Sequence, residues 1–419
     1  MIGTVDLPRS NAELSSEYDL FCRARLGDPY PLFHQLRQES PVHWCAPLDC
    51  WLVTRYDDVL AGHADPRLSS DKMQVKMKQL PPSLRKKVER LGRHLSMWVS
   101  HTDPPDHTRL RRLVHLAFTP AVVAGMRPRI QDIVDGLIDR AETQGRMDVI
   151  ADFAYPLPVT VVCELLGIPP QDVTQFTQWV EDIVAFIDGS ELEIPNVAER
   201  SLQSLLELTD YFHEIAEERQ RSPRDDMISA LVAVEEEGNR LSADELFAMC
   251  VQMLVGGHDT TTGLIGNGML ALLQNPAECE KLKANPALID SAVEEFLRYE
   301  SPGPRDTRLA LEDLEIGGQQ VRAGQAVVLM LAAANRDPEQ FPDPDRLDIC
   351  RQPNKHVAFG WGIHFCLGAP LARLMGEIAV NTLLRRLPGI RFADSSWRQN
   401  PPWRETAGLR MVKSLPVVY

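Results

Sequence analysis

A ten-residue loop near the C-terminus, Phe359-Gly-Trp-Gly-Ile-His-Phe-Cys-Leu-Gly368, constrains this chain more than any other feature. Its glycines allow positive φ or a close approach to a ligand. The apolar run from 369 to 387 follows at once and predicts a helix, so a Cys366 thiolate would lie where amide N–H groups and the helix dipole favour negative charge. The loop therefore predicts a soft anionic ligand held against a metal. An inert buried thiol is the alternative for a single cysteine.

A long helix is predicted upstream of this loop. Ser242-Ala-Asp-Glu245 has the sequence of a capping box, and the helix that it opens can extend to Asn275-Pro276. Such a helix is roughly 45 Å long and could cross a whole domain. Gly256 and Gly257 lie at its middle, where each glycine costs about 1 kcal/mol relative to Ala. Room for a small ligand is one reason to keep them.

Asp259 follows these glycines and adjoins Thr260. It is the only formal charge between Glu245 and Glu278. A buried carboxylate must be paired or must exchange protons, and the second case suits a proton relay. The alternative is a helix kink with a satisfied Asp–Thr pair.

The segment from 101 to 120 contains D-P-P-D-H-T-R-L-R-R and predicts a helix that starts at the prolines. His107 and Arg111 are four residues apart and therefore share one face of this helix. Two donors so arranged can bind a carboxylate, and arginine can do so with two hydrogen bonds. An ordinary basic surface is the alternative explanation of the spacing.

The cysteine loop reads F-G-x-G-x-H-x-C-x-G and resembles the cytochrome P-450 family of haem-thiolate monooxygenases. The resemblance runs in order from about Pro104 to Leu387. It implies that Cys366 is the axial ligand of the iron in a b-type haem. It implies propionate binding by His107, Arg111 and Arg308. It implies that His356 and His364 donate hydrogen bonds either to the propionates or to the residues around the iron ligand. The haem-binding residues that it implies are Cys366, His107, Arg111, Arg308, His356, Phe359, Gly360, His364 and Gly368.

The same resemblance makes Asp259 and Thr260 the acid–alcohol pair of the family's oxygen-activation helix, which delivers protons during catalysis. Glu295 and Arg298 match the family's E-x-x-R motif, a buried pair behind the haem. Their spacing alone would indicate a surface salt bridge worth roughly 0.3–0.5 kcal/mol. Arg346 stands where the family often supplies a third partner.

We expect a mainly α fold, with one large helical domain over residues 1–419 and a smaller β-rich part. Hairpins are predicted around 46–49 and around Gly317-Gly318. Residues 68–100 are basic and show no clear period, so they are interpreted as a binding loop or as a solvated surface loop.

Composition excludes several classes of protein. The net charge of -15 argues against a nucleic-acid binder and against an anionic-membrane binder. Residues 1–17 are polar and lack an apolar signal-peptide core. The eight cysteines show no zinc-type spacing, which fits a reducing cytoplasm. The apolar stretch from 246 to 277 contains polar residues and is interpreted as a buried core helix rather than a membrane span.

The function expected from the resemblance is insertion of one oxygen atom from O2 into a hydrophobic small organic molecule, either by hydroxylation or by epoxidation. The chain has no flavin or iron–sulfur motif of its own, so a ferredoxin and ferredoxin reductase are expected to supply electrons. A basic patch of Arg109, Arg111, Arg112, His115, Lys355 and Arg373 is the predicted docking surface. A peroxide-driven oxygenase and a non-catalytic haem sensor are the alternatives.

Overall fold

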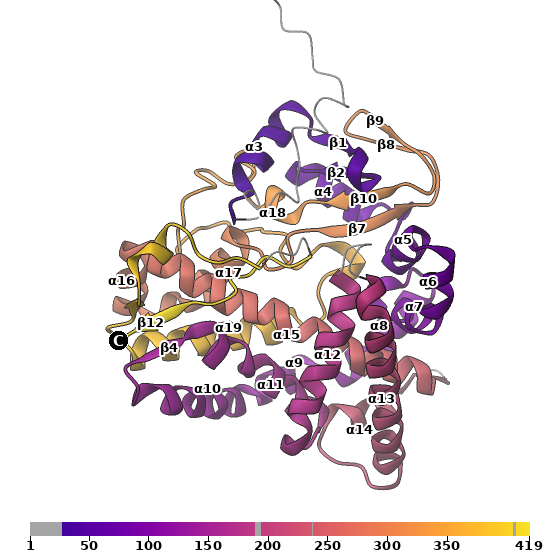
Figure 1. Cartoon of the computed structure of the whole chain (residues 1–419), viewed down its shortest axis with the longest axis horizontal. Coiled ribbons are helices and arrows are strands. Elements are labelled where there is room, and N and C mark those ends of the chain that lie inside the picture. Colours follow the sequence, from indigo (N-terminus) through magenta and orange to yellow (C-terminus); the bar gives the residue numbers. More distant parts are fainter. Residues whose placement is uncertain (1–26, 189–193, 237, 405–407) are drawn as a thin grey trace, which may run out of the picture.

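The computed structural model describes residues 27–188, 194–236, 238–404 and 408–419 (Figure 1). The polar stretch from 1 to 17 lies outside the described residues. Helices make up most of the described chain and strands form small sheets, which confirms the predicted fold class. The organisation of residues 1–419 as one domain stays a prediction.

One long helix, α15, runs through the middle of the fold (Figure 1). It spans Ala243–Gln274, and both hydrogen bonds of the predicted capping box are present between Ser242 and Glu245. Three further helices pack against it: α11 (Pro156–Leu166), α17 (Ile289–Tyr299) and α19 (Ala369–Arg386). Most side chains in the second half of α15 are buried, because helices cover it on several sides. The prediction of a core helix is therefore confirmed.

Other helices surround this group. They are α3 (Tyr30–Glu39), α4 (Tyr56–Ala64), α8 (Asp106–Ala117), α9 (Pro120–Gly125), α10 (Arg127–Glu142), α12 (Val173–Asp188), α13 (Ile194–Arg221), α14 (Met227–Ala233), α16 (Pro276–Ala284) and α18 (Leu331–Ala334). The stretch Val149–Leu166 is long and apolar enough to span a membrane, but 67% of it is buried inside the fold. Such burial is typical of a helical segment in the core of a protein.

The β-rich part lies at the top of Figure 1 and contains a five-stranded sheet in the order β1-β2-β10-β7-β3. Its strands are β1 (Val42–Cys45), β2 (Cys50–Val53), β10 (Ala326–Leu329), β7 (Asp306–Ala310) and β3 (Leu68–Ser69). The predicted hairpin around 46–49 is present, with Cys45 opposite Cys50. Strand β7 pairs with both β10 and β3, so it lies inside the sheet.

Smaller sheets complete the β structure. They comprise β8 (Leu314–Ile316) with β9 (Gln319–Val321), β5 (Glu235–Glu236) with β6 (Asn239–Arg240), and β11 (Arg391–Phe392) with β12 (Pro416–Val418) and β4 (Arg146–Asp148). Gly317 and Gly318 have φ of 53° and 81°, as the predicted turn requires.

Residues 68–100 differ from the prediction of a loop. After β3 they form three short helices, α5 (Lys72–Gln79), α6 (Pro82–Lys87) and α7 (Glu89–Ser96). Pro81 and Pro82 separate the first two, and each helix is too short to repeat an apolar period. Packing stabilises them, because α5 contacts α7, and α7 contacts α13 and α15.

Candidate functional site

The cysteine loop leads directly into α19. Gly360 and Gly362 have φ of 70° and 72°, which L side chains rarely adopt. A methyl group at Gly362 would lie 3.3 Å from the carbonyl oxygen of His63 in α4, so glycine also allows this close approach. The Cys366 N–H donates to the Phe359 carbonyl at 2.9 Å and closes the loop. The predicted helix after the loop is confirmed, and it begins at Ala369.

The surroundings of Cys366 have opposing effects on the pKa of its thiol. Burial raises the pKa of the Cys366 thiol, while hydrogen bonds from the N–H groups of Gly368 and Ala369 and the charge of Arg111 act to lower it. The amides expected from the sequence therefore do point at the sulfur. A coordinated metal cation deprotonates a thiol outright, and these same donors would stabilise the resulting thiolate.

The two predicted clamp residues of α8 both contact the cysteine loop. His107 is buried, and its ring centroid lies 4.2 Å from that of His364. Arg111 donates from Nη2 to the Phe365 carbonyl at 2.6 Å. The predicted shared face is confirmed, because His107 and Arg111 reach the same loop.

Arg308 extends from β7 and is 1% exposed. Its Nη1 donates to the Asp306 carboxylate at 2.7 Å, and its Nη2 lies 3.1 Å from Nδ1 of His63. Lys72 also pairs with Asp306. Burial acts to raise the pKa of the Asp306 carboxyl, but the charges of Lys72 and Arg308 outweigh it and lower this pKa far below its usual range. No sequence pattern pointed to His63, because its partner Arg308 is 245 residues away along the chain.

Three imidazole nitrogens near the cysteine loop are buried without a hydrogen-bond partner in the described chain: His63 Nε2, His107 Nε2 and His364 Nδ1. Buried polar groups are normally satisfied, so each one needs an explanation. A ligand that brings acceptor oxygens would satisfy them, and the neighbouring Arg111 and Arg308 would favour carboxylates. Together with a thiol ligand, this donor set fits an iron porphyrin with two propionates.

His356 is placed differently from His107 and His364. Its Nε2 lies 3.1 Å from the Glu294 carboxylate, and its Nδ1 accepts from the Ala358 N–H at 3.2 Å. Arg373 binds the same carboxylate at 2.6 and 2.9 Å. Of the two roles predicted for His356, these contacts favour support behind the loop over a propionate contact.

Asp259 and Thr260 lie on α15 and have separate partners. The Thr260 hydroxyl donates to the Gly256 carbonyl at 2.8 Å. The Asp259 carboxylate lies 3.3 Å from Nη1 of Arg404, in the C-terminal part of the chain. A Cβ on Gly256 would meet open space, while one on Gly257 would lie 3.0 Å from Val162 of α11. Gly256 thus gives the predicted room, and Gly257 allows close helix packing.

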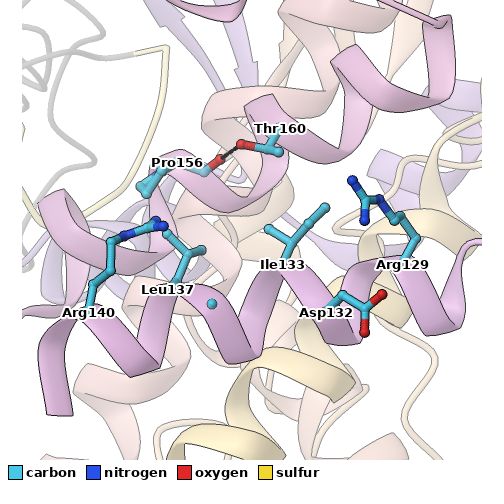
Figure 2. A pocket seen from close by; sticks show the side chains of 8 residues that line it. Arg129, Asp132, Ile133, Leu137, Arg140, Pro156 and Thr160 are labelled. Carbon is cyan, nitrogen blue, oxygen red and sulfur yellow. Dashed lines mark hydrogen bonds between the residues drawn. The ribbon is translucent and has the colours of Figure 1, made fainter. Parts of the chain in front are cut away.

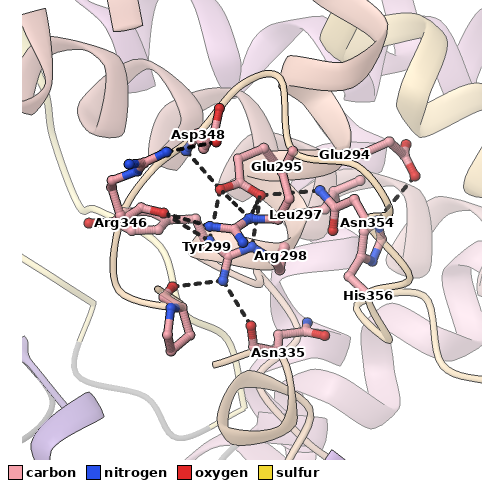
Figure 3. A network of polar contacts seen from close by, with 12 residues as sticks. Glu294, Glu295, Leu297, Arg298, Tyr299, Asn335, Arg346, Asp348, Asn354 and His356 are labelled. Carbon is pink, nitrogen blue, oxygen red and sulfur yellow. Dashed lines mark hydrogen bonds and ion pairs between the residues drawn. The ribbon is translucent and has the colours of Figure 1, made fainter. Parts of the chain in front are cut away.

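Glu295 and Arg298 form a fully buried bidentate pair, with nitrogen–oxygen distances of 2.7 and 2.8 Å (Figure 3). The prediction that Arg346 is the third partner of this pair is wrong for its side chain. Arg346 gives only its carbonyl to Arg298, and its guanidinium pairs with Asp348 at 3.0 Å. Arg351 takes that position instead, at 3.2 Å from Glu295. The pair joins α17 to the chain that precedes the cysteine loop.

The predicted basic patch is partly neutralised. Arg109 pairs with Glu245, Arg373 binds Glu294, and Arg111 is half-buried. Arg112, His115 and Lys355 are exposed. Exposed apolar side chains lie near them in the sequence, at Leu116 of α8 and at Trp361 and Ile363 of the cysteine loop.

A surface depression of about 320 Å³ lies between α10 and α11 (Figure 2). It is lined by Arg129, Asp132, Ile133, Gly136, Leu137, Arg140, Pro156 and Thr160. Arg129 is paired with Glu164 at 2.5 Å. None of the predicted site residues lines this depression, so it is not part of the candidate site.

Comparison with known proteins agrees with this geometry. Residues 82–388 match the family described as Cytochrome P450. The polyketide biosynthesis cytochrome P450 PksS of Bacillus subtilis is 41% identical over 403 residues, which cover 93% of this chain and 95% of that protein. Vitamin D(3) 25-hydroxylase of Pseudonocardia autotrophica is 40% identical over 407 residues, which cover 96% of each.

Solved structures give the same result for the fold. P450BioI, in complex with an acyl carrier protein ligated to hexadec-9Z-enoic acid, superposes with a TM-score of 0.86 at 37% identity, covering 94% of this chain and 99% of that one. The structure of PksS from Bacillus subtilis superposes with a TM-score of 0.85 at 39% identity, covering 96% and 99%.

Proposed function

This chain belongs to the cytochrome P450 family, and we propose that Cys366 is the iron ligand of a b-type haem. Members of this family are haem-thiolate monooxygenases, and this chain is one of the bacterial type. The observation that carries the proposal is the Cys366 sulfur, towards which the N–H groups of Gly368 and Ala369 point. These donors stabilise a thiolate without any rearrangement of the loop.

The residues that would hold the haem carboxylates are His107, Arg111, Arg308 and His364. Arg308 is fixed in an inner strand, and His107 is fixed on α8 against His364. Phe359, Gly360 and Gly368 shape the loop around the thiolate, and His356 supports that loop through Glu294. When bound, the haem would supply activation of O2 and acceptance of electrons.

Proton delivery is the task proposed for Asp259 and Thr260. The Thr260 hydroxyl is bound to a carbonyl of its own helix, from which one χ1 rotation would release it. The Asp259 carboxylate is held in place by Arg404, at 3.3 Å. When the carboxylate turns away from Arg404, a proton taken up at its oxygen would pass to the Thr260 oxygen while the Thr260 hydroxyl gives its own proton onward, towards the side where the haem would bind O2. General acid–base assistance of this kind is typically worth about 10²–10⁴-fold in rate.

We propose a hydrophobic secondary metabolite as the substrate. Relatives named for polyketide biosynthesis and for vitamin D(3) hydroxylation support this class. A roof over the substrate is expected from α12 and α13, which pack together. Lys76 of α5 joins this roof by donating to the Ile187 carbonyl at 2.9 Å. Ile183 and Phe186 on α12 are fully buried in the apolar core of this region.

A ferredoxin, reduced by a ferredoxin reductase, is the proposed electron donor, and the cytoplasm is the proposed compartment. Arg112 and Lys355 are exposed cations, His115 is exposed as well, and Trp361 and Ile363 are exposed apolar side chains of the cysteine loop. A surface of both kinds suits a weak, salt-sensitive complex with an acidic protein. Arg112→Glu should slow reduction and leave substrate affinity unchanged, and salt-independent reduction would contradict this docking surface.

The test of Cys366 is spectroscopic. The reduced, CO-bound protein should show the strongly red-shifted Soret band of thiolate ligation. Cys366→Ser should abolish this band, while Cys350→Ser, which alters an exposed thiol, should leave it unchanged. Loss of the band on mutation of any other cysteine would refute the assignment.

Turnover measurements distinguish the proposed monooxygenase from two alternatives, a peroxide-driven oxygenase and a non-catalytic haem sensor. With NADPH, ferredoxin, reductase and ¹⁸O2, one labelled oxygen atom should appear in the product. A peroxide-driven enzyme would form product from hydrogen peroxide alone, and a sensor would form none. The presence of Asp259 and Thr260 favours the O2-dependent monooxygenase over the peroxide-driven enzyme. A peroxide-driven reaction does not need protons from these residues to activate O2.

A further inference from the structure

His63 lies in α4, and its side chain is 1% exposed. Nothing in the sequence pattern assigns it a role. Its Nδ1 lies 3.1 Å from Nη2 of Arg308, which is a proposed haem-carboxylate ligand. The same helix contacts the cysteine loop, where a Cβ on Gly360 would lie 3.6 Å from Cε1 of the His63 ring. His63 thus lies between the strand that carries Arg308 and the loop that carries Cys366.

The contact with Arg308 fixes which His63 nitrogen carries the proton. A guanidinium can only donate hydrogen bonds, so Nδ1 of His63 must accept. Burial lowers the pKa of His63 to about 4, so the ring is neutral at pH 7. A neutral ring with an accepting Nδ1 carries its hydrogen on Nε2. That Nε2–H is buried and has no acceptor among the described residues.

A buried donor without an acceptor is costly, which indicates that an acceptor is missing. The charged groups that face the ring are Asp306, Arg308 and Lys72. Asp306 is already bound by Lys72 and Arg308, and its carboxylate lies 3.9 Å from Nδ1, on the side opposite to the unused hydrogen. The same three groups act on His364, which has its own unpartnered nitrogen. The two unpartnered nitrogens, Nε2 of His63 and Nδ1 of His364, therefore both belong to rings that face these three groups, whose net charge is +1.

We propose that Nε2–H of His63 donates a hydrogen bond to the haem carboxylate that Arg308 binds, and that Nδ1 of the same ring holds Arg308 in position. His63 is then an additional positioning residue for the cofactor in this chain. The inference rests on the proposed binding of the haem carboxylates by Arg308. An anionic acceptor explains the donor better than a buried water, because a water would also need acceptors for its own hydrogens.

The test compares holoenzymes of two His63 variants. His63→Leu removes the ring donor and the acceptor for Arg308, while His63→Gln keeps an amide N–H of similar reach. We expect haem transfer from His63→Leu to apomyoglobin to be roughly ten- to a hundredfold faster than from the wild type. His63→Gln should lie much closer to the wild type. Resonance Raman bands of haem-propionate bending should shift in His63→Leu, and the thiolate CO band should stay.

His94→Leu is the matched control. His94 is also a buried histidine with an unpartnered Nε2, but its charged neighbours are Asp244 and Arg90 rather than the Arg308 group. The His94→Leu variant should therefore have the same rate of haem transfer and the same propionate bands as the wild type. Equal haem transfer and equal propionate bands in His63→Leu and the wild type would overturn the inference and leave the proposed function intact. A wild-type protein that takes up no haem would overturn both.

Discussion

The Asp259 carboxylate of α15 is held 3.3 Å from the guanidinium of Arg404, which lies 145 residues further along the chain. Asp259 is buried, whereas the Arg404 side chain is 31% exposed. The only formal charge in this part of α15 is therefore neither unpaired nor bound to its neighbour Thr260. Its partner comes from the C-terminal part of the chain and reaches the solvent.

Removing Arg404 should lower the stability of the folded protein. Arg404→Gln leaves a buried carboxylate without a counter-charge, and we expect a loss of roughly 1–2 kcal/mol, less than for a fully buried pair. Thermal unfolding of Arg404→Gln, Asp259→Asn and the double variant forms a double-mutant cycle. The double variant should lose less than the sum of the single losses. Additive losses would show that the two side chains do not interact.

Thr260→Ala should separate oxygen consumption from product formation. The variant should keep haem binding and first-electron reduction, consume O2, release hydrogen peroxide and form less product. Thr262→Ala is a matched control, because the Thr262 hydroxyl makes the same kind of bond, to the His258 carbonyl at 3.1 Å, but is buried. The ratio of product formed to O2 consumed measures this coupling in both variants. Unchanged coupling in Thr260→Ala would remove Thr260 from the catalytic residues.

Arg351 and Arg346 offer a paired test of the network behind the cysteine loop. The Arg351 side chain is 8% exposed and contacts the fully buried Glu295, so Arg351→Gln should cost roughly 1–2 kcal/mol. The Arg346 side chain is 67% exposed, and Arg346→Gln should leave the free energy of unfolding unchanged within error. Denaturant titration of the holoenzymes measures both changes. A larger loss for Arg346→Gln would contradict the structure.

Buried neutral histidines should make stability depend on pH. Burial lowers the pKa of His94 to about 4, whereas an unfolded histidine titrates near about 6.5. Between these values the unfolded chain binds the extra proton, so stability should fall as the pH drops from about 6.5 to about 4. His94→Leu should flatten this part of the curve of melting temperature against pH. An unchanged slope would mean that His94 is protonated in the folded protein.

Features encoded by neighbouring residues were predictable from the sequence. The capping box at Ser242 fixes the start of α15, and Gly317-Gly318 fixes a hairpin, because each depends on a few adjacent residues. The cysteine loop belongs to this class, since positive φ at Gly360 and the N–H groups after Cys366 follow from its own ten residues. The short helices between 68 and 100 escaped prediction, because packing rather than a repeated apolar pattern stabilises them.

The sequence by itself determined the cysteine loop, the long central helix and the residue types that we propose to bind a haem. The tertiary structure alone decided their partners: Arg404 for Asp259, Arg351 rather than Arg346 for Glu295, and His63 for Arg308. The physical reason is that a buried charge takes whichever partner the packing of distant elements brings within hydrogen-bond distance. Spacing along the chain specifies a helix face or a turn, but it carries no information about that distance.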